Sequence, residues 1–357
     1  MSIEKIVFDE KYYNRVIKEY AYNSFTAEHI NFSLGNLSKE ELQAKWLCHD
    51  GGDLFAEDFR KGKKCIIATG FGLSGVPHVG TLSQILKAVR LQRAGIPVSM
   101  VIGDLDAYNN KNTSLYKTLE LVEPYRKFII SLGFDVSNSI LRAQFDDLDT
   151  LRVFYLIGRY MDDNLFDKAE EDLHGSHRKS VQKNSNTKMY FRRKLSLGLM
   201  TADFINLYMR EKYDHVLVML GIDEHKFVGL AKEVTKRINK DVNEDYFTDF
   251  NLKIGGIYTT IIKGFNNFPK MSKSIKGSGI TVDMKPEKIK DLIMNKEGTY
   301  DSPENNVVYQ MIANASLYDL NEIKRAYLAC KHDIQKWLKI KKDYADMLID
   351  VCSKWKK

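Results

Sequence analysis

The chain has few cysteines and prolines and lacks a long hydrophobic run. Its 357 residues include 4 Cys and 6 Pro. The cysteines are scattered and form no CxxC pair, so we expect neither a disulfide framework nor a protein-held metal. No stretch reaches the ~18 consecutive apolar residues of a membrane span, so we expect no membrane partner. The first residues form no apolar signal segment, which makes the cytoplasm the expected compartment.

The composition that is present is that of a folded, mildly basic protein. Hydrophobic residues make up 44% of the chain, which excludes a disordered or collagen-like sequence. The length allows one large or two modest domains, since domains usually span ~100–200 residues. Lys and Arg number 54 against 47 Asp and Glu, a net charge of +7. This charge allows an anionic partner but does not require one.

Short apolar segments alternate with amphipathic ones, which predicts an α/β fold with a parallel sheet wrapped by helices. Strands are expected at 64–69, 98–103 and 214–219. The strand, glycine turn, helix and strand over 64–103 match the start of a Rossmann-like half. We divide the chain into a mostly helical extension at 1–62, an α/β domain at 63–284 with a helical connection at about 150–210, and a helical C-terminal domain at 285–357.

A glycine-rich turn, GFGLSGVPHVGT, follows the first of these strands at 70–81. Glycines let a ligand approach the backbone, and the N-terminus of the next helix attracts phosphate. His78 stands at the start of that helix and could donate a hydrogen bond to a phosphate. A tight turn with a solvent-facing histidine is an equally open alternative, because a glycine-rich turn alone is a weak signal.

A second candidate segment, FPKMSKS, occupies 268–274. Lys270 and Lys273 lie three residues apart in a loop that glycines flank. A mobile loop of this kind can close its ammonium groups on a polyphosphate. The alternative is an ordinary basic surface loop. The occurrence of both segments in one chain, in this order, favours the phosphate-binding interpretation.

Together the two segments resemble the signature motifs of class I aminoacyl-tRNA synthetases. Residues 78–81 (HVGT) resemble the HIGH motif, and 270–274 match the KMSKS loop letter for letter. Between them, LMTAD at 199–203 and LGIDE at 220–224 resemble the LMxAD and GxDQ segments of tryptophanyl-tRNA synthetases. The resemblance covers about residues 60–345, and the tyrosyl enzymes of the same subclass are close competitors.

The resemblance implies a Rossmann-like class I catalytic domain followed by a helical domain. Such an enzyme activates an amino acid, here most simply tryptophan, with ATP and Mg²⁺ and passes it to a tRNA. Its residues position the reactants and stabilise charge on the phosphoryl oxygens. Mg²⁺ bridges phosphates and needs no cage of protein ligands. The resemblance also implies a homodimer, with its contact near residues 150–210.

The resemblance further implies individual roles. The implied catalytic residues are His78, Lys270 and Lys273. The implied ATP-binding residues are Gly72, Ser74, Gly80, Thr81, Gly221, Asp223, Met271 and Ser272. The implied amino-acid-binding residues are Phe71, Asp104, Asp106, Met200, Asp203 and Glu224.

Within the implied amino-acid pocket, Asp203 would accept the indole N–H and Met200 would pack on the ring. A buried carboxylate that faces one donor discriminates strongly, because an analogue without the donor leaves it unpaired. Two ordinary alternatives stay open: Asp203 could be a capping or salt-bridged acid, and Met200 could fill the core. Asp104 and Asp106 qualify because they end a strand, where α/β sheets bind ligands.

Two positions depart from the family pattern. Thr81 replaces the last histidine of HIGH, and Glu224 replaces the glutamine of GxDQ, which turns an amide into an acceptor-only carboxylate. Amino-acid choice is the property that these departures affect. Two alternatives therefore stay open: a paralogue that uses another amino acid or a non-tRNA acceptor, and a non-catalytic binding protein. The intact KMSKS segment argues against the second.

Two basic segments bear on tRNA. Residues 171–195 hold seven Lys or Arg against two acidic residues, and residues 331–357 hold eight Lys against four Asp. Such segments can bind a phosphate backbone without reading its sequence. A solvated helix face or a loop without a ligand is the alternative for each.

Overall fold

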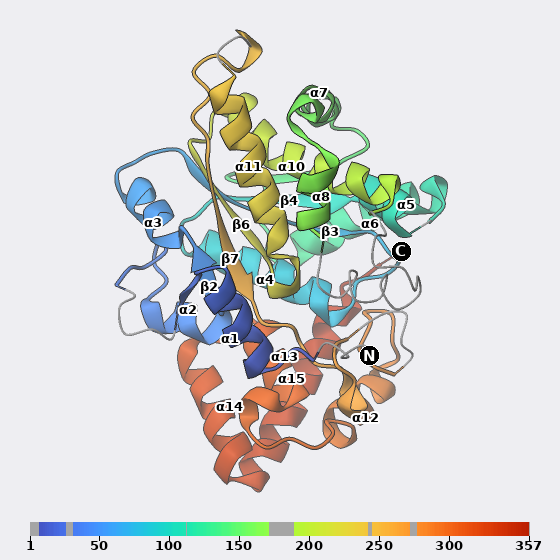
Figure 1. Cartoon of the computed structure of the whole chain (residues 1–357). Coiled ribbons are helices and arrows are strands. Elements are labelled where there is room, and N and C mark those ends of the chain that lie inside the picture. Colours follow the sequence, from blue (N-terminus) through green and yellow to red (C-terminus); the bar gives the residue numbers. More distant parts are fainter. Residues whose placement is uncertain are drawn as a thin grey trace, which may run out of the picture.

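The architecture is that of a single twisted sheet with helices on both faces (Figure 1). The computed structural model describes residues 7–25, 31–111, 113–170, 189–241, 245–271 and 277–356. Among these residues seven strands form one sheet in the order β1-β2-β7-β6-β3-β4-β5. The strands are β1 (Asn23–Ser24), β2 (Cys48–Asp50), β3 (Cys65–Gly72), β4 (Val98–Gly103), β5 (Ile140–Ala143), β6 (His215–Gly221) and β7 (Lys253–Thr259).

Strands β3 to β7 are parallel, so their carboxyl ends meet at one edge of the sheet. Ile67 of β3 lies opposite Val98 of β4 and opposite Leu217 of β6. The predicted α/β fold with a parallel sheet is confirmed. The short strands β1 and β2 extend the sheet antiparallel, through β2 and β7. They come from the segment that we expected to be mostly helical, and their two and three residues are too few to show a period-2 pattern.

Helices cover both faces of the sheet, and none that the structure describes is long and apolar enough to cross a membrane. They are α1 (Glu10–Glu19), α2 (Lys39–Lys45), α3 (Gly52–Arg60), α4 (Val79–Arg93), α5 (Asp104–Lys111), α6 (Leu115–Ser131), α7 (Leu148–Ile157), α8 (Asp163–Lys168), α10 (Phe191–Met209), α11 (Lys226–Lys240), α12 (Pro286–Asn295), α13 (Val307–Asn314), α14 (Leu320–His332) and α15 (Ile334–Ser353).

Two apolar cores lie on the two faces of the sheet. One contains buried residues of α4 together with Met311 of α13 and Trp337 of α15. The other contains Phe204 of α10 and Val234 of α11. Figure 1 shows α14 and α15 at the opposite end of the molecule from α7 and α11. The division into three domains stays a prediction, although α12 does begin at Pro286, where we placed the last boundary.

Candidate active site

A cavity of about 240 Å³ lies at the carboxyl ends of β3, β4 and β6. This is the edge where parallel α/β sheets place ligands, because the strand-to-helix turns converge there. Helices α5 and α10 and the short turn η2 (Ile222–Glu224) complete the walls. The structure brings eight predicted site residues into the lining: Phe71, Gly72, Asp106, Met200, Asp203, Asp223, Glu224 and Lys270.

The glycine at the end of β3 lies close to a carboxylate. A Cβ atom on Gly72 would lie 2.5 Å from Oδ2 of Asp106. Asp106 starts from α5, which follows β4 directly, so the two strand ends bring this carboxylate over bare backbone. Gly221 ends β6 beside η2, which carries Asp223 and Glu224. Ser74 is half-buried in the turn between β3 and α4.

His78 caps the N-terminus of α4. Its Nδ1 accepts the backbone N–H of Thr81 at 3.0 Å. A neutral ring that accepts at Nδ1 carries its hydrogen on Nε2 and can donate from that atom. A Cβ atom on Gly80 would lie 2.7 Å from Cε1 of His78, so glycine leaves room for the ring. His78, Gly80 and Thr81 stand at the helix N-terminus, outside the lining of the cavity.

Lys270 enters the cavity from the loop after β7. Its Nζ lies 3.4 Å from Oδ2 of Asp223 and 5.8 Å from the ring centroid of Phe8. Phe8 is buried just before α1, and no motif in the sequence indicated this contact. Met271 is buried and donates its N–H to the carbonyl of Ile262 at 3.2 Å. Ser272 and Lys273 lie outside the described residues.

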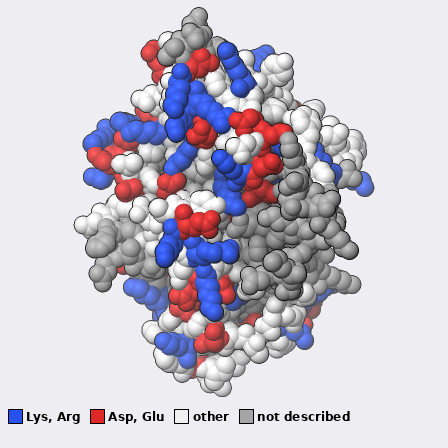
Figure 2. Space-filling view, viewed as in Figure 1, with Lys and Arg blue, Asp and Glu red and all other residues white. Residues whose placement is uncertain are grey.

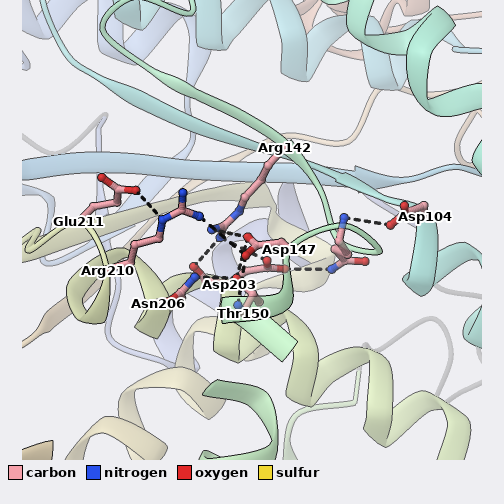
Figure 3. A network of polar contacts seen from close by, with 9 residues as sticks. Asp104, Arg142, Asp147, Thr150, Asp203, Asn206, Arg210 and Glu211 are labelled. Atoms are coloured by element: carbon pink, nitrogen blue, oxygen red, sulfur yellow. Dashed lines mark hydrogen bonds and ion pairs between the residues drawn. The ribbon is translucent and has the colours of Figure 1, made fainter. Parts of the chain in front are cut away.

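The opposite wall contains a buried carboxylate in a polar network (Figure 3). Asp203 of α10 accepts a hydrogen bond from Nε2 of Gln144 at 2.9 Å, and Nη2 of Arg142 lies 3.3 Å from its Oδ1. Burial raises the pKa of Asp203 from 3.8 to about 6, against the opposing effect of the Arg142 charge. Asp203 is therefore both salt-bridged and part of the cavity wall, so the two interpretations do not exclude each other.

The network continues away from the cavity through Arg142. Nη1 of Arg142 lies 2.9 Å from Oδ2 of Asp147, and that carboxylate caps α7 by accepting the N–H and the hydroxyl of Thr150. Asn206 of α10 donates to Oγ1 of Thr150 at 2.8 Å. Figure 3 shows the chain of contacts extending to Arg210, which pairs with Glu211. The polar side chains of β5, α7 and α10 therefore hold Asp203 in one place.

The carboxylate of Asp104 binds backbone N–H groups and is not part of the cavity wall. Its Oδ1 accepts backbone N–H groups of Leu105 at 2.9 Å, Gln144 at 3.0 Å and Phe145 at 3.1 Å. Burial raises the pKa of Asp104, and these hydrogen bonds oppose the shift. The carboxylate ties the end of β4 to the segment after β5, and it does not line the cavity.

Sequence reasoning missed several residues of the cavity. Gln144 lines the cavity and Arg142 pairs with Asp203, and neither belongs to a motif that we identified. Arg193 also lines the cavity, although the sequence placed it only in the basic segment 171–195. Ser196 lies one helical turn before Met200 on α10, and its buried hydroxyl has no hydrogen-bond partner among the described residues. The i, i+4, i+7 spacing of Ser196, Met200 and Asp203 on one helix face was the available signal.

Comparison with known proteins shows the family. The model of the class I tRNA synthetases (W and Y) matches residues 60–350. The chain belongs to this family. A tyrosine–tRNA ligase of Methanopyrus kandleri is 26% identical over 226 residues, which are 62% of this chain and 61% of that protein. The chain thus aligns with about three fifths of that relative's length.

Solved structures of similar fold come from both branches of the family. Tryptophanyl-tRNA synthetase from Aeropyrum pernix K1 is 18% identical, with a TM-score of 0.69 and coverage of 97% of this chain and 96% of that one. Tyrosyl-tRNA synthetase from Archaeoglobus fulgidus is 19% identical, with a TM-score of 0.67 and coverage of 88% and 98%. These likenesses confirm the Rossmann-like class I fold.

The structure describes the two basic segments to different extents. Residues 171–188 of the first lie outside the described residues, and Lys194 in its remainder pairs with Asp163 of α8. In the second, Lys341 is buried and lies 2.9 Å from Glu297, so that part of the charge is neutralised within the fold. Lys336 of α15 pairs with Asp333, and Asp346 of α15 pairs with Lys290 of α12.

Proposed function

We propose that the protein activates an aromatic amino acid, tryptophan as the first candidate, with ATP and transfers it to a tRNA. The observation that carries the proposal is one cavity with two chemically different ends. Lys270 of the KMSKS segment and Asp223 stand at one end, and the buried, networked Asp203 stands at the other. A nucleotide fits the first end and an amino-acid side chain with a hydrogen-bond donor fits the second.

In the activation step a carboxylate oxygen of the amino acid attacks the α-phosphorus of ATP. The bond from that phosphorus to the bridging oxygen breaks, and pyrophosphate leaves with the electron pair. Lys270, with Lys273 and His78, stabilises the charge that grows on the phosphate oxygens. Asp223 accepts from the ribose. Among the described residues no group of three or more His, Cys, Asp or Glu could hold a metal ion, so Mg²⁺ would enter on the phosphates.

Tyrosine is the second candidate substrate. The tyrosine–tRNA ligase of Methanopyrus kandleri supports it, whereas the segments LMTAD and LGIDE favour tryptophan. Asp203 does not choose between the two by charge, since an indole N–H and a phenol O–H are both donors. Glu224, an acceptor in the cavity wall, adds to the preference for a donor-bearing side chain.

We also propose a cytoplasmic homodimer with α7 in the contact. Leu148 and Tyr155 of this helix are 60% and 86% exposed, which is unusual for large apolar side chains on one short helix. Burial of these side chains against a second copy would remove that surface from water. Sedimentation at micromolar concentration tests the dimer, and Tyr155→Glu should shift it to monomer.

Pyrophosphate exchange into ATP tests the activation step. The protein is incubated with ATP, labelled pyrophosphate and each standard amino acid separately. Exchange with tryptophan alone supports the first candidate, and exchange with tyrosine alone replaces it by the second. Exchange with another amino acid indicates a paralogue of different specificity. No exchange with any amino acid, with or without tRNA, overturns the proposal. Charging of total tRNA then tests the acceptor.

A further inference from the structure

Helix α13 lies between α4 and α14 and contacts both of them (Figure 1). It carries two buried amide side chains, Gln310 and Asn314, whose i, i+4 spacing places them on one side of the helix. The Nδ2 atom of Asn314 donates to the carbonyl of Gln310 at 2.9 Å. We call these two side chains the amide pair of α13. Each of them contacts a different segment of the proposed nucleotide site.

Gln310 contacts the connection that leads from β7 to the KMSKS segment. Its Oε1 accepts the backbone N–H of Lys263 at 2.7 Å, and its Nε2 donates to the carbonyl of Glu304 at 2.7 Å. One end of the amide accepts and the other end donates, so these two partners fix the orientation of the side chain. The connection before Lys270 is thereby attached to α13.

Backbone contacts extend this attachment to the KMSKS segment itself. The N–H of Gly264 donates to the carbonyl of Phe268 at 2.9 Å. The N–H of Met271 donates to the carbonyl of Ile262 at 3.2 Å. These two hydrogen bonds lie on either side of Lys270 in the sequence. A displacement of the connection would therefore displace Lys270 as well.

Asn314 contacts α4, the helix that His78 caps. Its Oδ1 accepts a hydrogen bond from Nζ of Lys87 at 2.8 Å, and the same ammonium group donates to Oγ of Ser83 at 2.9 Å. Lys87 and Ser83 both belong to α4. The lysine therefore joins α4 to the end of α13.

Lys87 lies in an unusual place for a lysine. Figure 2 shows the usual place of Lys and Arg side chains, at the surface and beside acidic ones. Lys87 is only 2% exposed, and its two acceptors among the described residues are uncharged. Burial lowers the pKa of Lys87 well below its usual value, and the charge of Lys45 adds to this effect. An apolar side chain would avoid this cost of desolvation, which favours a role for the hydrogen bonds beyond stability.

The two nucleotide segments also contact each other directly. The N–H of Val79 donates to the carbonyl of Ile280 at 3.0 Å, and the N–H of Val282 donates to the carbonyl of Pro77 at 3.0 Å. Ile280 and Val282 follow the KMSKS segment in the sequence, whereas Pro77 and Val79 flank His78. Contacts thus lead from α13 to both segments and from one segment to the other.

We propose that the amide pair of α13 and Lys87 position the two segments, so that His78 and Lys270 act on the same phosphate chain. The inference rests on the proposed activation step. The amide pair and Lys87 do not line the active-site cavity, so they act through the segments that they contact. Misplacement of a catalytic group by about 1 Å can slow a reaction about a hundredfold, which gives such contacts an effect on the rate.

A matched pair of variants tests Gln310 in the pyrophosphate-exchange assay. Gln310→Met keeps the length of the side chain and removes both hydrogen bonds, so it should lower kcat about tenfold. Tyr344→Phe is the control, because it removes a buried hydrogen bond to the carbonyl of Ala315, directly after α13. This hydroxyl binds neither nucleotide segment among the described residues, and the control should keep the native kcat.

Lys87→Met and Lys45→Met form a second matched pair. Both lysines are buried and both bind α13, since Nζ of Lys45 donates to the carbonyl of Ala313 at 3.2 Å. Lys45 belongs to α2, whereas Lys87 belongs to α4. Only Lys87→Met should therefore lower kcat, by about tenfold. Equal losses within either pair overturn the assignment and indicate a role in stability alone.

The amino-acid KM and a Lys270→Ala background separate positioning from general damage. Gln310→Met should leave the amino-acid KM within about twofold of the native value, because Asp203 stands on α10. In a Lys270→Ala protein the same substitution should slow exchange much less, since a group through which it acts is gone. A loss of about tenfold in that background overturns the inference. Native kcat in Gln310→Met and Lys87→Met also overturns it, and both results leave the activation step standing.

Absence of exchange in the native protein would overturn the proposed function instead. Hydrogen–deuterium exchange over residues 260–271 then still reports the contact of Gln310 with the connection. Gln310→Met should speed amide exchange in this stretch, whereas Tyr344→Phe should leave it unchanged. Unchanged protection in Gln310→Met overturns the positioning role whether or not the native protein is active.

Discussion

The two ends of the active-site cavity are built in opposite ways. At the end that we propose for the amino acid, Asp203 is buried and held by Arg142 and Gln144, which are themselves held by further polar contacts. At the end that we propose for the nucleotide, glycines expose backbone, and the Nζ atom of Lys270 lies 3.4 Å from Oδ2 of Asp223. The polar contacts of the first end are within the protein, whereas we expect those of the second to be completed by the substrate.

The physical reason is the cost of buried charge. A carboxylate out of water must be paired and hydrogen-bonded, so Asp203 can exist only inside a network that also fixes its position. The side chains of Lys270 and Asp223 remain 31% and 12% exposed, and a partly solvated pair of this length is worth little. Lys270 can therefore leave Asp223 to follow a phosphate at small cost.

Removal of the Lys270 cation should have the largest effect. Lys270→Ala should slow pyrophosphate exchange about 10²–10³-fold, because a charge that stabilises the transition state is lost. The KM for the amino acid should stay nearly constant, since the other end of the cavity is independent. Lys288→Ala, an exposed lysine on α12, is the matched control. A parallel rise in amino-acid KM would show that the two ends are not separate.

Loss of the central cation of the network should instead destabilise the fold. Arg142→Met leaves Asp203 and Asp147 buried without their shared partner and should lower the free energy of unfolding by about 3 kcal/mol in urea denaturation. Arg152→Met is the control, because the ion pair of Arg152 with Asp149 is exposed and should change stability by less than about 0.5 kcal/mol. Equal effects would mean that the amino-acid end is not preassembled.

The pH dependence of substrate binding should distinguish the two ends further. Because burial raises the pKa of Asp203 to about 6, the carboxylate ionises as the pH rises through this value. The KM for the amino acid should thus fall about tenfold from pH 5 to pH 7, since one pH unit below the pKa leaves about a tenth ionised. The KM for ATP should change little. A sloping amino-acid profile in Asp203→Asn would remove this group from substrate binding.

The raised pKa of Asp203 also affects the free energy of unfolding, and this contribution decreases as the pH rises. The folded-state pKa of Asp203 lies above the unfolded value, so the native state binds more protons between the two values. This contribution is full below about pH 4 and is lost as the pH rises through about 6.

The smallest effect is expected at Asp223. Asp223→Asn keeps an acceptor for the ribose but loses the charge, so the KM for ATP should rise about fivefold. The free energy of unfolding should change by less than about 1 kcal/mol, because the pair with Lys270 is weak. Measurement of both quantities on one preparation checks the contrast. A large loss of stability would place Asp223 with the rigid end instead.

The end of the cavity that we propose for the nucleotide could be predicted from local sequence patterns, whereas most contacts at the other end could not. The nucleotide end depends on local features, namely a glycine turn after a strand and two lysines in one short segment, which a linear pattern can show. The amino-acid end depends on β5 and α10, whose residues Arg142 and Asp203 are 61 positions apart. No local pattern relates them. Asp104 shows the converse, because its place at a strand end predicted a pocket residue, whereas its carboxylate accepts backbone N–H groups and does not line the cavity.

The alternation of strands and helices and the resemblance to the class I synthetases could be read from the sequence, because these depend on neighbours in the chain. The arrangement of distant segments established which of the candidate carboxylates line the cavity and which side chains hold Asp203 there. Those properties depend on burial and on contacts between distant segments. Such contacts exist only once the parallel strands have brought their ends to one edge.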